Sequence, residues 1–279
     1  MDDRPQESRR DVVVVTGAGG MGAAIARRLG SGRTLIVADA SRDQLDRAVG
    51  ALRDEGYDAR GVLTDVSDRG SVEWLAETAY GEGRLAAVVH TAGVSPATGT
   101  AKKILDVDLV GTAHVIDVFE KVASHGMSLV CVSSMAGHYA SLSAAQEAAL
   151  ATTPTEELLG LDVVTAIGDD AQSAYIVSKR ANQLRVQAAA LAWNLRGARV
   201  NSVSPGVIST AMAKAEAESP SGEHMLKMLD ACGAGRTGTP GEIAEVVAFL
   251  VGPGAPYITG TDLLVDGGQA AWIRWHRPR

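Results

Sequence analysis

The chain has 279 residues, 46% of which are hydrophobic, so it can bury one substantial core without needing a second domain. Its formal net charge is −7 and its sequence pI is about 5.4, and lysine and arginine are scattered along the chain, which argues against a nucleic-acid-binding protein. No apolar run approaches the length of a membrane span, so we expect no membrane association.

The first residues and the cysteines favour a cytoplasmic protein. Residues 1–10 are polar and lack the apolar stretch of a signal peptide, so we expect a frayed tail followed by a single domain over 11–279. Cys131 and Cys232 stand apart without C-x-x-C spacing, which favours two reduced, buried thiols. The six histidines show no metal-ligand spacing, and we predict no metal site.

A glycine-rich turn follows the first apolar run. Residues 11–16 are rich in valine and typical of a buried strand, and residues 23–29 have helical character. The turn between them reads Gly17-Ala18-Gly19-Gly20-Met21-Gly22, which matches the G-x-G-x-x-G pattern. The first two glycines of the pattern allow the backbone to approach a pyrophosphate, and the last lets the helix pack closely on the strand. This context favours dinucleotide binding over a purely structural turn.

The next strand, expected at residues 34–38, delivers Asp39 about 20 residues after the first glycine of the turn. At that offset an acidic side chain can accept hydrogen bonds from the adenosine ribose hydroxyls and repels a 2′-phosphate, so NAD is favoured over NADP. Arg42 lies near enough to weaken this preference. The alternative role of Asp39, a helix cap ahead of Ser41, does not explain its offset from the glycines.

Strands and helices keep alternating as far as the apolar strand that ends at His90. This rhythm predicts parallel strands covered by helices on both faces. Ligands collect at the carboxyl ends of such strands. There, Asp65 could meet an adenine ring and Ala92-Gly93 could admit a cofactor closely, although an ordinary turn acid and turn glycine explain each of them equally well taken singly.

Hydroxyl groups that could handle a proton appear later in the chain. Ser134 follows the strand expected at 128–132 and could hydrogen-bond a substrate oxygen, although a cap or turn role explains it equally well alone. Tyr175 and Lys179 lie four residues apart in a helix expected at about 173–195, so they share a face. A cation about 4 Å from a phenol is worth about 4 kcal/mol at an effective dielectric near 20, which favours proton exchange near neutral pH.

Two segments depart from the strand–helix rhythm. Residues 139–170 are rich in Ala, Leu, Thr and Glu, and we expect one or two inserted helices there that form a lid, a partner surface or both. Residues 211–235 keep apolar side chains that could line a substrate pocket or simply pack a short helix, namely Met212, Met225, Leu226, Met228 and Leu229. We expect Trp272 and Trp275 to pack on a neighbouring subunit or back on the sheet.

Together these features resemble the short-chain dehydrogenase/reductase family over nearly the whole chain. The matching marks are the glycine turn with Thr16, Asp65-Val66, Ala92-Gly93, Ser134, Tyr175 with Lys179, Pro205-Gly206 with Thr210, and Asp266-Gly267-Gly268. The resemblance implies a single α/β domain with a Rossmann-type, doubly wound parallel sheet of about seven strands. The insertion, Ala192-Trp193 and the terminal region are similar to the bacterial 3α-hydroxysteroid dehydrogenase/carbonyl reductase group.

The resemblance also implies hydride transfer between a nicotinamide ring and a carbonyl carbon. Tyr175 would be the general acid and base, Ser134 would hold the substrate oxygen, and Lys179 would lower the pKa of the tyrosine while binding the nicotinamide ribose. The further cofactor contacts it implies are Gly17, Gly19, Gly20, Met21, Gly22, Asp39, Asp65, Val66, Ala92, Gly93, Pro205, Gly206, Ile208 and Thr210.

The sequence departs from the family's usual pattern at three places. The glycine turn is one residue shorter than the frequent T-G-x-x-x-G-x-G form, and Thr91 replaces the asparagine of the usual N-A-G. Asp108 aligns with the family's helix asparagine, whose backbone helps to hold a relay water. We include Asp108 among the catalytic residues and hypothesise that it still serves this relay. Its carboxylate could also hold the Lys179 ammonium more firmly and alter the pH optimum.

We therefore expect an NAD-dependent oxidoreductase that interconverts an apolar secondary alcohol and its ketone, with a hydroxysteroid as one candidate. One alternative is a sugar-nucleotide epimerase or dehydratase, which the short region after Pro205-Gly206 disfavours. Another is a non-catalytic dinucleotide-binding protein, which intact Ser134, Tyr175 and Lys179 disfavour. The resemblance implies a homodimer or homotetramer assembled through the helices expected at about 101–124 and 173–195, one of which the insertion could block.

Overall fold

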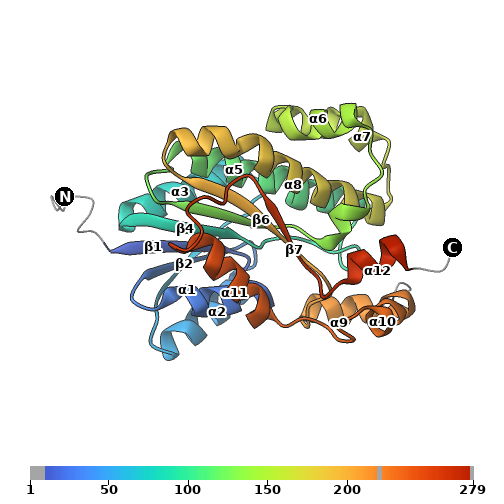
Figure 1. The fold of residues 1–279 in the computed structure, drawn as a ribbon. Helices are drawn as coiled ribbons and strands as arrows, with labels where there is room; N and C mark the ends of the chain where they lie inside the picture. The colour runs from blue at the N-terminus through green and yellow to red at the C-terminus, as the bar shows by residue number, and fades with distance from the viewer. Residues whose placement is uncertain (1–9, 219–221, 277–279) are drawn as a thin grey trace.

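A central sheet lies between two layers of helices (Figure 1). The computed structural model describes residues 10–218 and 222–276, without the side chains of Glu216, His224, Met225, Met228 and Ala231. The N-terminal tail expected at 1–10 therefore lies almost entirely outside the described residues.

The sheet has seven strands, all parallel, in the order β3-β2-β1-β4-β5-β6-β7. The strands are β1 (Asp11–Thr16), β2 (Thr34–Asp39), β3 (Asp58–Leu63), β4 (Arg84–His90), β5 (Ser128–Val132), β6 (Arg199–Pro205) and β7 (Asp262–Val265). The order reverses direction between β1 and β4, which is the point where doubly wound sheets bind their ligands. The predicted Rossmann-type sheet is confirmed.

Burial on both faces explains the unbroken apolar runs in the strands. The valines from Val12 to Val15 are at most 1% exposed, so consecutive residues of β1 point into cores on opposite sides of the sheet. One core lies beneath α1 (Gly20–Gly30), α2 (Arg42–Asp54) and α11 (Pro240–Val251). The other lies beneath α3 (Arg69–Glu82), α5 (Thr112–Lys121) and α8 (Ala171–Leu195), on the opposite face of the sheet (Figure 1).

The inserted segment forms α6 (Ala144–Thr152), η4 (Thr155–Gly160) and α7 (Asp162–Thr165). Leu150, Leu158 and Val164 are buried in one apolar cluster with side chains of α8 and with Leu109 and Ala113. Figure 1 shows α6 and α7 on the outer side of α8, away from the sheet. The insertion is therefore a layer over α8.

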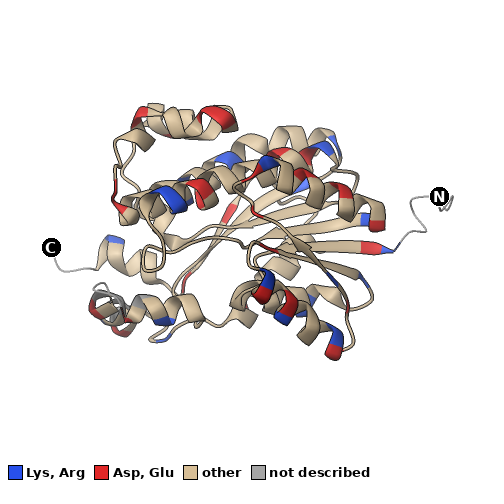
Figure 2. Cartoon of the chain, turned by 180° about the vertical axis from the view of Figure 1, so that it is seen from behind, with Lys and Arg blue, Asp and Glu red and all other residues tan. Residues whose placement is uncertain are grey.

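Three short helices gather beyond the carboxyl ends of the strands (Figure 1). They are α9 (Ala211–Ala217), α10 (Gly222–Ala231) and α12 (Gln269–Trp275). Lysine and arginine are interspersed with aspartate and glutamate over the side of the molecule seen in Figure 2. Within residues 10–218 and 222–276, the structure has no helix that combines the length and the apolar character needed to cross a membrane.

Candidate active site

The long helix α8 carries Tyr175 and Lys179. It begins after Asp170, whose carboxylate accepts a hydrogen bond from the Gln172 backbone N–H (3.0 Å) and so caps the first turn. Because Tyr175 and Lys179 share a face, Lys179 Nζ lies 5.3 Å from the centre of the Tyr175 ring. Lys179 is 5% exposed, so its charge acts in an interior that screens it weakly.

A carboxylate meets this buried ammonium. Asp108 is fully buried, and its Oδ2 lies 3.1 Å from Lys179 Nζ, while its Oδ1 accepts a hydrogen bond from the Val94 N–H (2.7 Å). Burial raises the pKa of the Asp108 carboxyl, although Lys179 and the Val94 amide oppose the rise. Burial acts most strongly on Lys179 and lowers its pKa, but Asp108, Tyr175 and Cys131 together outweigh it, and the pKa of the ammonium is raised.

The helix that carries Asp108 differs from the single helix expected at 101–124. It consists of α4 (Ala101–Ile104), the π-helical segment η2 (Leu105–Gly111) and α5. A π turn adds a residue to a helical turn and often marks a functional site. Asp108 lies within this wider turn, and nothing in the periodicity of the sequence indicated it.

Ser134 lies in a loop that is docked on α8 and leads into η3 (Met135–Tyr139). The Ser133 hydroxyl donates to the Lys179 carbonyl (2.7 Å), and the Gln183 side-chain amide donates to the Ser134 carbonyl (3.3 Å). The Ser134 hydroxyl accepts a backbone N–H (3.1 Å), so its own proton can be donated to a ligand. Sequence reasoning missed Gln183, which carries no motif of its own.

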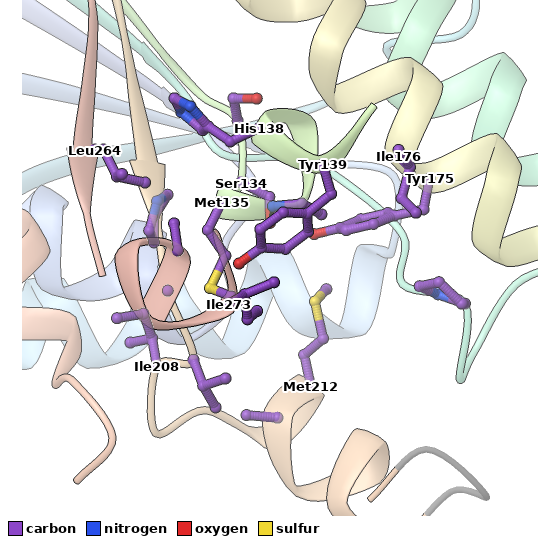
Figure 3. A pocket seen from close by; sticks show the side chains of 18 of the residues that line it. Ser134, Met135, His138, Tyr139, Tyr175, Ile176, Ile208, Met212, Leu264 and Ile273 are labelled. Carbon is purple, nitrogen blue, oxygen red and sulfur yellow. Dashed lines mark hydrogen bonds between the residues drawn. The ribbon is translucent and has the colours of Figure 1, made fainter. Parts of the chain in front are cut away.

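Ser134 and Tyr175 lie in the wall of a cavity of about 1230 Å³ (Figure 3). The wall is mainly apolar and is built from α8, η3, α9, α12 and the segment after β6. Its larger apolar side chains include Met135, Ile176, Ile208, Met212, Leu264 and Ile273. The two hydroxyls that could hold a reacting oxygen are thus set in a surface that suits hydrocarbon.

A second tyrosine, Tyr139, lines the same cavity and was not singled out from the sequence. In Figure 3 its hydroxyl points toward Met135 and Ile273. This hydroxyl is buried and makes no hydrogen bond within the described part of the chain. Burial raises the pKa of the phenol, and Asp266 adds to the effect, so Tyr139 stays protonated at neutral pH.

The glycine turn between β1 and α1 is tightly packed. Gly17 has a φ of +85°, which side chains rarely adopt, and a β-carbon on Gly22 would lie 1.8 Å from the Gly17 carbonyl oxygen. A β-carbon on Gly20 would lie 3.1 Å from Thr210 Cγ2, so the turn faces the segment after β6. Such a cradle at a helix N-terminus, which only glycine backbone fits, suits the pyrophosphate of a dinucleotide.

Other predicted cofactor residues connect this turn to the cavity. Met21 and Thr210 line the cavity at the end that faces the turn, together with Pro205, Gly206 and Ile208. Sequence segments far apart along the chain therefore share one hollow, in which a cofactor could reach from the glycine turn to Tyr175.

Asp39 ends β2 beside the glycine turn. Its Oδ2 accepts hydrogen bonds from the Ala18 N–H (2.8 Å) and the Gln44 side-chain amide (3.0 Å), and its Oδ1 accepts one from the Ser41 N–H (2.8 Å). Its contacts thus join the glycine turn to the start of α2, in agreement with the predicted role near a helix cap, and the contact with the ribose hydroxyls stays a prediction. Arg42 is exposed, and Gln44 was not predicted.

The remaining predicted pairs differ in their surroundings. Burial would raise the pKa of the Asp65 carboxyl, but hydrogen bonds from the Ser67 N–H (3.0 Å) and hydroxyl (2.6 Å) outweigh it and lower the pKa. The Asp65 side chain is therefore engaged in its own turn. Gly93 lies against the ion pair, because a β-carbon there would be 3.3 Å from Lys179 Nζ and 3.4 Å from both Asp108 oxygens.

Only part of the predicted substrate segment can be placed. Met212 lines the cavity, whereas Leu229 is buried and Leu226 is 53% exposed without lining it. The side chains of Met225 and Met228 lie outside the described residues. In the tail, Trp275 lines the cavity and is 71% exposed, so its ring is not packed on the sheet.

Two family models match the chain. Residues 11–149 match the model described as short chain dehydrogenase, and residues 139–270 match the model described as enoyl-(acyl carrier protein) reductase. The short-chain dehydrogenase/reductase bsc3 of Alternaria brassicicola is 38% identical over 270 residues, which cover 95% of this chain and 97% of that protein. The 3-alpha-hydroxysteroid dehydrogenase/carbonyl reductase of Comamonas testosteroni is 29% identical over 81% of this chain and 94% of its own length.

The fold has matching solved structures as well. The 3-alpha-hydroxysteroid dehydrogenase from Pseudomonas sp. B-0831, complexed with NADH, is 27% identical and superposes with a TM-score of 0.77 over 96% of this chain and 100% of its own. Sequence and fold therefore agree over nearly the full length. The chain belongs to the short-chain dehydrogenase/reductase family, and it is an oxidoreductase that acts on CH–OH groups with a nicotinamide dinucleotide.

Proposed function

We propose that this protein uses NAD to interconvert an apolar secondary alcohol and its ketone, with hydroxysteroids as the first substrate class to test. The observation that carries the proposal is one cavity of about 1230 Å³ whose mainly apolar wall holds both Ser134 and Tyr175. The apolar wall favours a substrate that buries hydrocarbon, and the two hydroxyls can fix a single reacting oxygen.

The side chains divide the work of the reaction between them. When bound, the nicotinamide ring supplies or accepts the hydride. Ser134 Oγ donates a hydrogen bond to the substrate oxygen and orients it. The Tyr175 hydroxyl gives its proton to that oxygen during reduction and takes it back during oxidation. The Lys179 ammonium, 5.3 Å from the ring centre, stabilises the phenolate.

The preference for NAD rests on Asp39. Its carboxylate is held at the end of β2 by the Ala18 N–H and the Gln44 amide. A fixed negative charge at this place accepts hydrogen bonds from ribose hydroxyls and repels a 2′-phosphate. The similar Pseudomonas enzyme is complexed with NADH, which supports the same choice.

Size and similarity support the hydroxysteroid class. The cavity is larger than the roughly 300 to 1,000 Å³ that is common for small-molecule pockets, so a multi-ring substrate fits beside a nicotinamide ring. The Comamonas and Pseudomonas relatives are both named for 3-alpha-hydroxysteroids.

We also propose that the protein is a cytoplasmic homodimer. The family usually assembles through the helices that correspond to η2–α5 and α8, and here α6 packs on α8 through Leu150, while Glu147 pairs with Arg180. The insertion thus covers one face that a tetramer would need. Sedimentation should give a dimer, and a tetramer that uses both helices would contradict this proposal.

The function is tested by following NADH and NADPH absorbance with a panel of hydroxysteroids, terpenols, acyl-chain alcohols and their ketones. We expect turnover with NAD and an apolar ring alcohol, and weaker turnover with NADP. NAD binding in calorimetry without turnover across the whole panel would overturn the substrate class. Turnover that prefers NADP would overturn the role given to Asp39.

A further inference from the structure

A histidine lines the cavity on the other side of Ser134 from Tyr175. His138 lies on η3, which begins directly after Ser134, and Figure 3 shows His138 and Tyr175 on either side of that serine. His138 Nε2 lies 2.9 Å from Oδ2 of Asp262, the first residue of β7. A carboxylate can only accept hydrogen bonds, so the ring donates this one through Nε2. Neither side chain takes part in the proton transfer by Tyr175.

The carboxylate beneath this histidine is held from two directions. The Asp262 side chain is 7% exposed, and its Oδ1 accepts hydrogen bonds from the Ser202 hydroxyl (2.6 Å) and the Ser204 hydroxyl (2.8 Å). Its other oxygen, Oδ2, accepts from His138. Because both carboxylate oxygens are engaged, Asp262 fixes the orientation of the His138 ring and determines which ring nitrogen carries the proton.

The second ring nitrogen, Nδ1, is left for a ligand. The His138 side chain is 32% exposed where it lines the cavity, and among the described residues its hydrogen bonding is confined to Nε2. In the neutral ring Nδ1 is an acceptor, because Nε2 holds the proton, whereas in the protonated ring Nδ1 donates. A hydroxyl can pair with Nδ1 in either case, since it both donates and accepts.

Shared hydrogen bonds join this nitrogen to the reacting end of the cavity. The Ser204 hydroxyl, which donates to Asp262, accepts a hydrogen bond from the Gln183 side-chain amide (2.9 Å). The same amide donates to the Ser134 carbonyl (3.3 Å). His138 and Ser134 are therefore placed by common partners, so a substrate that meets both must carry its two oxygens at a matching distance.

From these contacts we propose that His138 and Asp262 form a subsite for a second hydroxyl of the substrate, remote from the alcohol or ketone that reacts. The proposal rests on the proposed function and narrows its substrate class to ring compounds with such a second hydroxyl. His138 touches the substrate and sets specificity, whereas Asp262 acts through His138 and is a positioning residue. A purely structural pair would tie η3 to β7 whatever the substrate, so the tests compare substrates.

The first test measures kcat/KM for a steroid diol with hydroxyls at opposite ends of the ring system and for the analogue that lacks the remote hydroxyl. We expect the diol to be favoured about tenfold. His138→Phe keeps an aromatic ring on η3 but removes both nitrogens, so the ratio should fall to about one. His125→Phe is the matched control, because His125 is exposed and does not line the cavity. A ratio that His138→Phe leaves unchanged would overturn the proposal.

The second test reverses the roles of the two ring nitrogens. In Asp262→Asn the side chain keeps an oxygen for the Ser202 and Ser204 hydroxyls and turns its amide N–H toward His138 Nε2, so the neutral ring carries its proton on Nδ1. The unaltered protein should prefer a remote hydroxyl to a remote ketone, which can only accept. Asp262→Asn should reduce this preference several-fold or invert it. An unchanged preference would contradict the role of Asp262.

Binding separates this proposal from the proposed function. Calorimetry on the NAD-loaded protein compares the steroid diol with the analogue that lacks the remote hydroxyl, and it needs no turnover. A preference for the diol that His138→Phe abolishes, without turnover of either steroid, would support the subsite and overturn the proposed reaction. Turnover of both steroids at equal kcat/KM, with equal binding, would support the reaction and overturn the subsite.

Discussion

The two walls of the cavity are built in opposite ways. The wall formed by α8, β5 and η3 is tied together by buried polar groups. The Ser133 hydroxyl donates a hydrogen bond to the Lys179 carbonyl, and the Gln183 side-chain amide donates one to the Ser134 carbonyl. The facing wall is formed by apolar side chains on short helices, with Met212 37% and Trp275 71% exposed. The first wall, which we call the fixed wall, can hold a reacting oxygen at one place. The second, which we call the adaptable wall, can adjust to different hydrocarbon shapes.

The largest effect is expected from the removal of one oxygen on the fixed wall. Tyr175→Phe keeps the ring beside Lys179 but leaves no proton to exchange, so kcat should fall by about 10² to 10⁴ while NAD binding stays within about twofold. Steady-state kinetics and calorimetry measure the two quantities. Loss of both together would mean that the substitution disturbs the cofactor site, and unchanged turnover would exclude Tyr175 as the acid and base.

The buried histidine His90, on β4 beneath the fixed wall, should make the protein sensitive to acid. Burial lowers the pKa of His90 from 6.5 to about 3, so the unfolded chain binds a proton at pH values where the folded protein does not. The neutral His90 side chain makes its full contribution to the free energy of unfolding above pH 6.5. This contribution is lost as the pH falls toward 3, at about 1.4 kcal/mol per pH unit. Denaturant unfolding between pH 7 and pH 4.5 measures the slope of the free energy of unfolding against pH.

His90→Gln should flatten that slope, because glutamine does not titrate. His125→Gln is the control, since His125 is exposed and its loss should leave the slope unchanged. Equal slopes in the His90 variant and the unaltered protein would contradict the assignment of the acid sensitivity to the buried imidazole.

A paired substitution compares the two walls directly. Gln183→Leu leaves the Ser134 carbonyl and the Ser204 hydroxyl without their donor, so the loop with Ser134 should loosen and kcat should fall by about tenfold. Met212→Leu on the adaptable wall conserves volume, so it should leave kcat nearly unchanged and alter KM by less than about threefold. If both variants changed only KM, the proposed difference between the walls would be wrong.

The same difference explains what could be predicted from the sequence. The glycine turn, Asp39 and the Tyr175–Lys179 spacing were found because their chemistry depends on neighbours along the chain. Gln183 and Gln44 were missed because each acts on a segment that only the fold brings near, the Ser134 loop and Asp39. Their side chains have no period or spacing that sets them apart from the other glutamines of the sequence.

Helix geometry limited the prediction in another way. A helix was correctly expected to begin at Ala101, but the π-helical segment Leu105–Gly111 inside it was not. A π turn costs hydrogen-bond geometry that tertiary contacts must offset, and those contacts include the Lys179 ammonium of α8 and the Val94 N–H, which both meet Asp108. The alignment of Asp108 with a family position indicated that it matters, whereas its ion pair with Lys179 could only be hypothesised.

The smallest expected effect concerns Tyr139, where the two walls meet. Its hydroxyl is buried without a hydrogen bond among the described residues, so Tyr139→Phe removes a polar group that nothing satisfies and should raise the free energy of unfolding by up to about 1 kcal/mol. A substrate with one oxygen should keep its KM. A ring substrate with a second oxygen, for which Tyr139 can donate a hydrogen bond, should show a KM raised a few-fold. Equal changes for both substrates would mean that the ring of Tyr139, and not its hydroxyl, shapes the cavity.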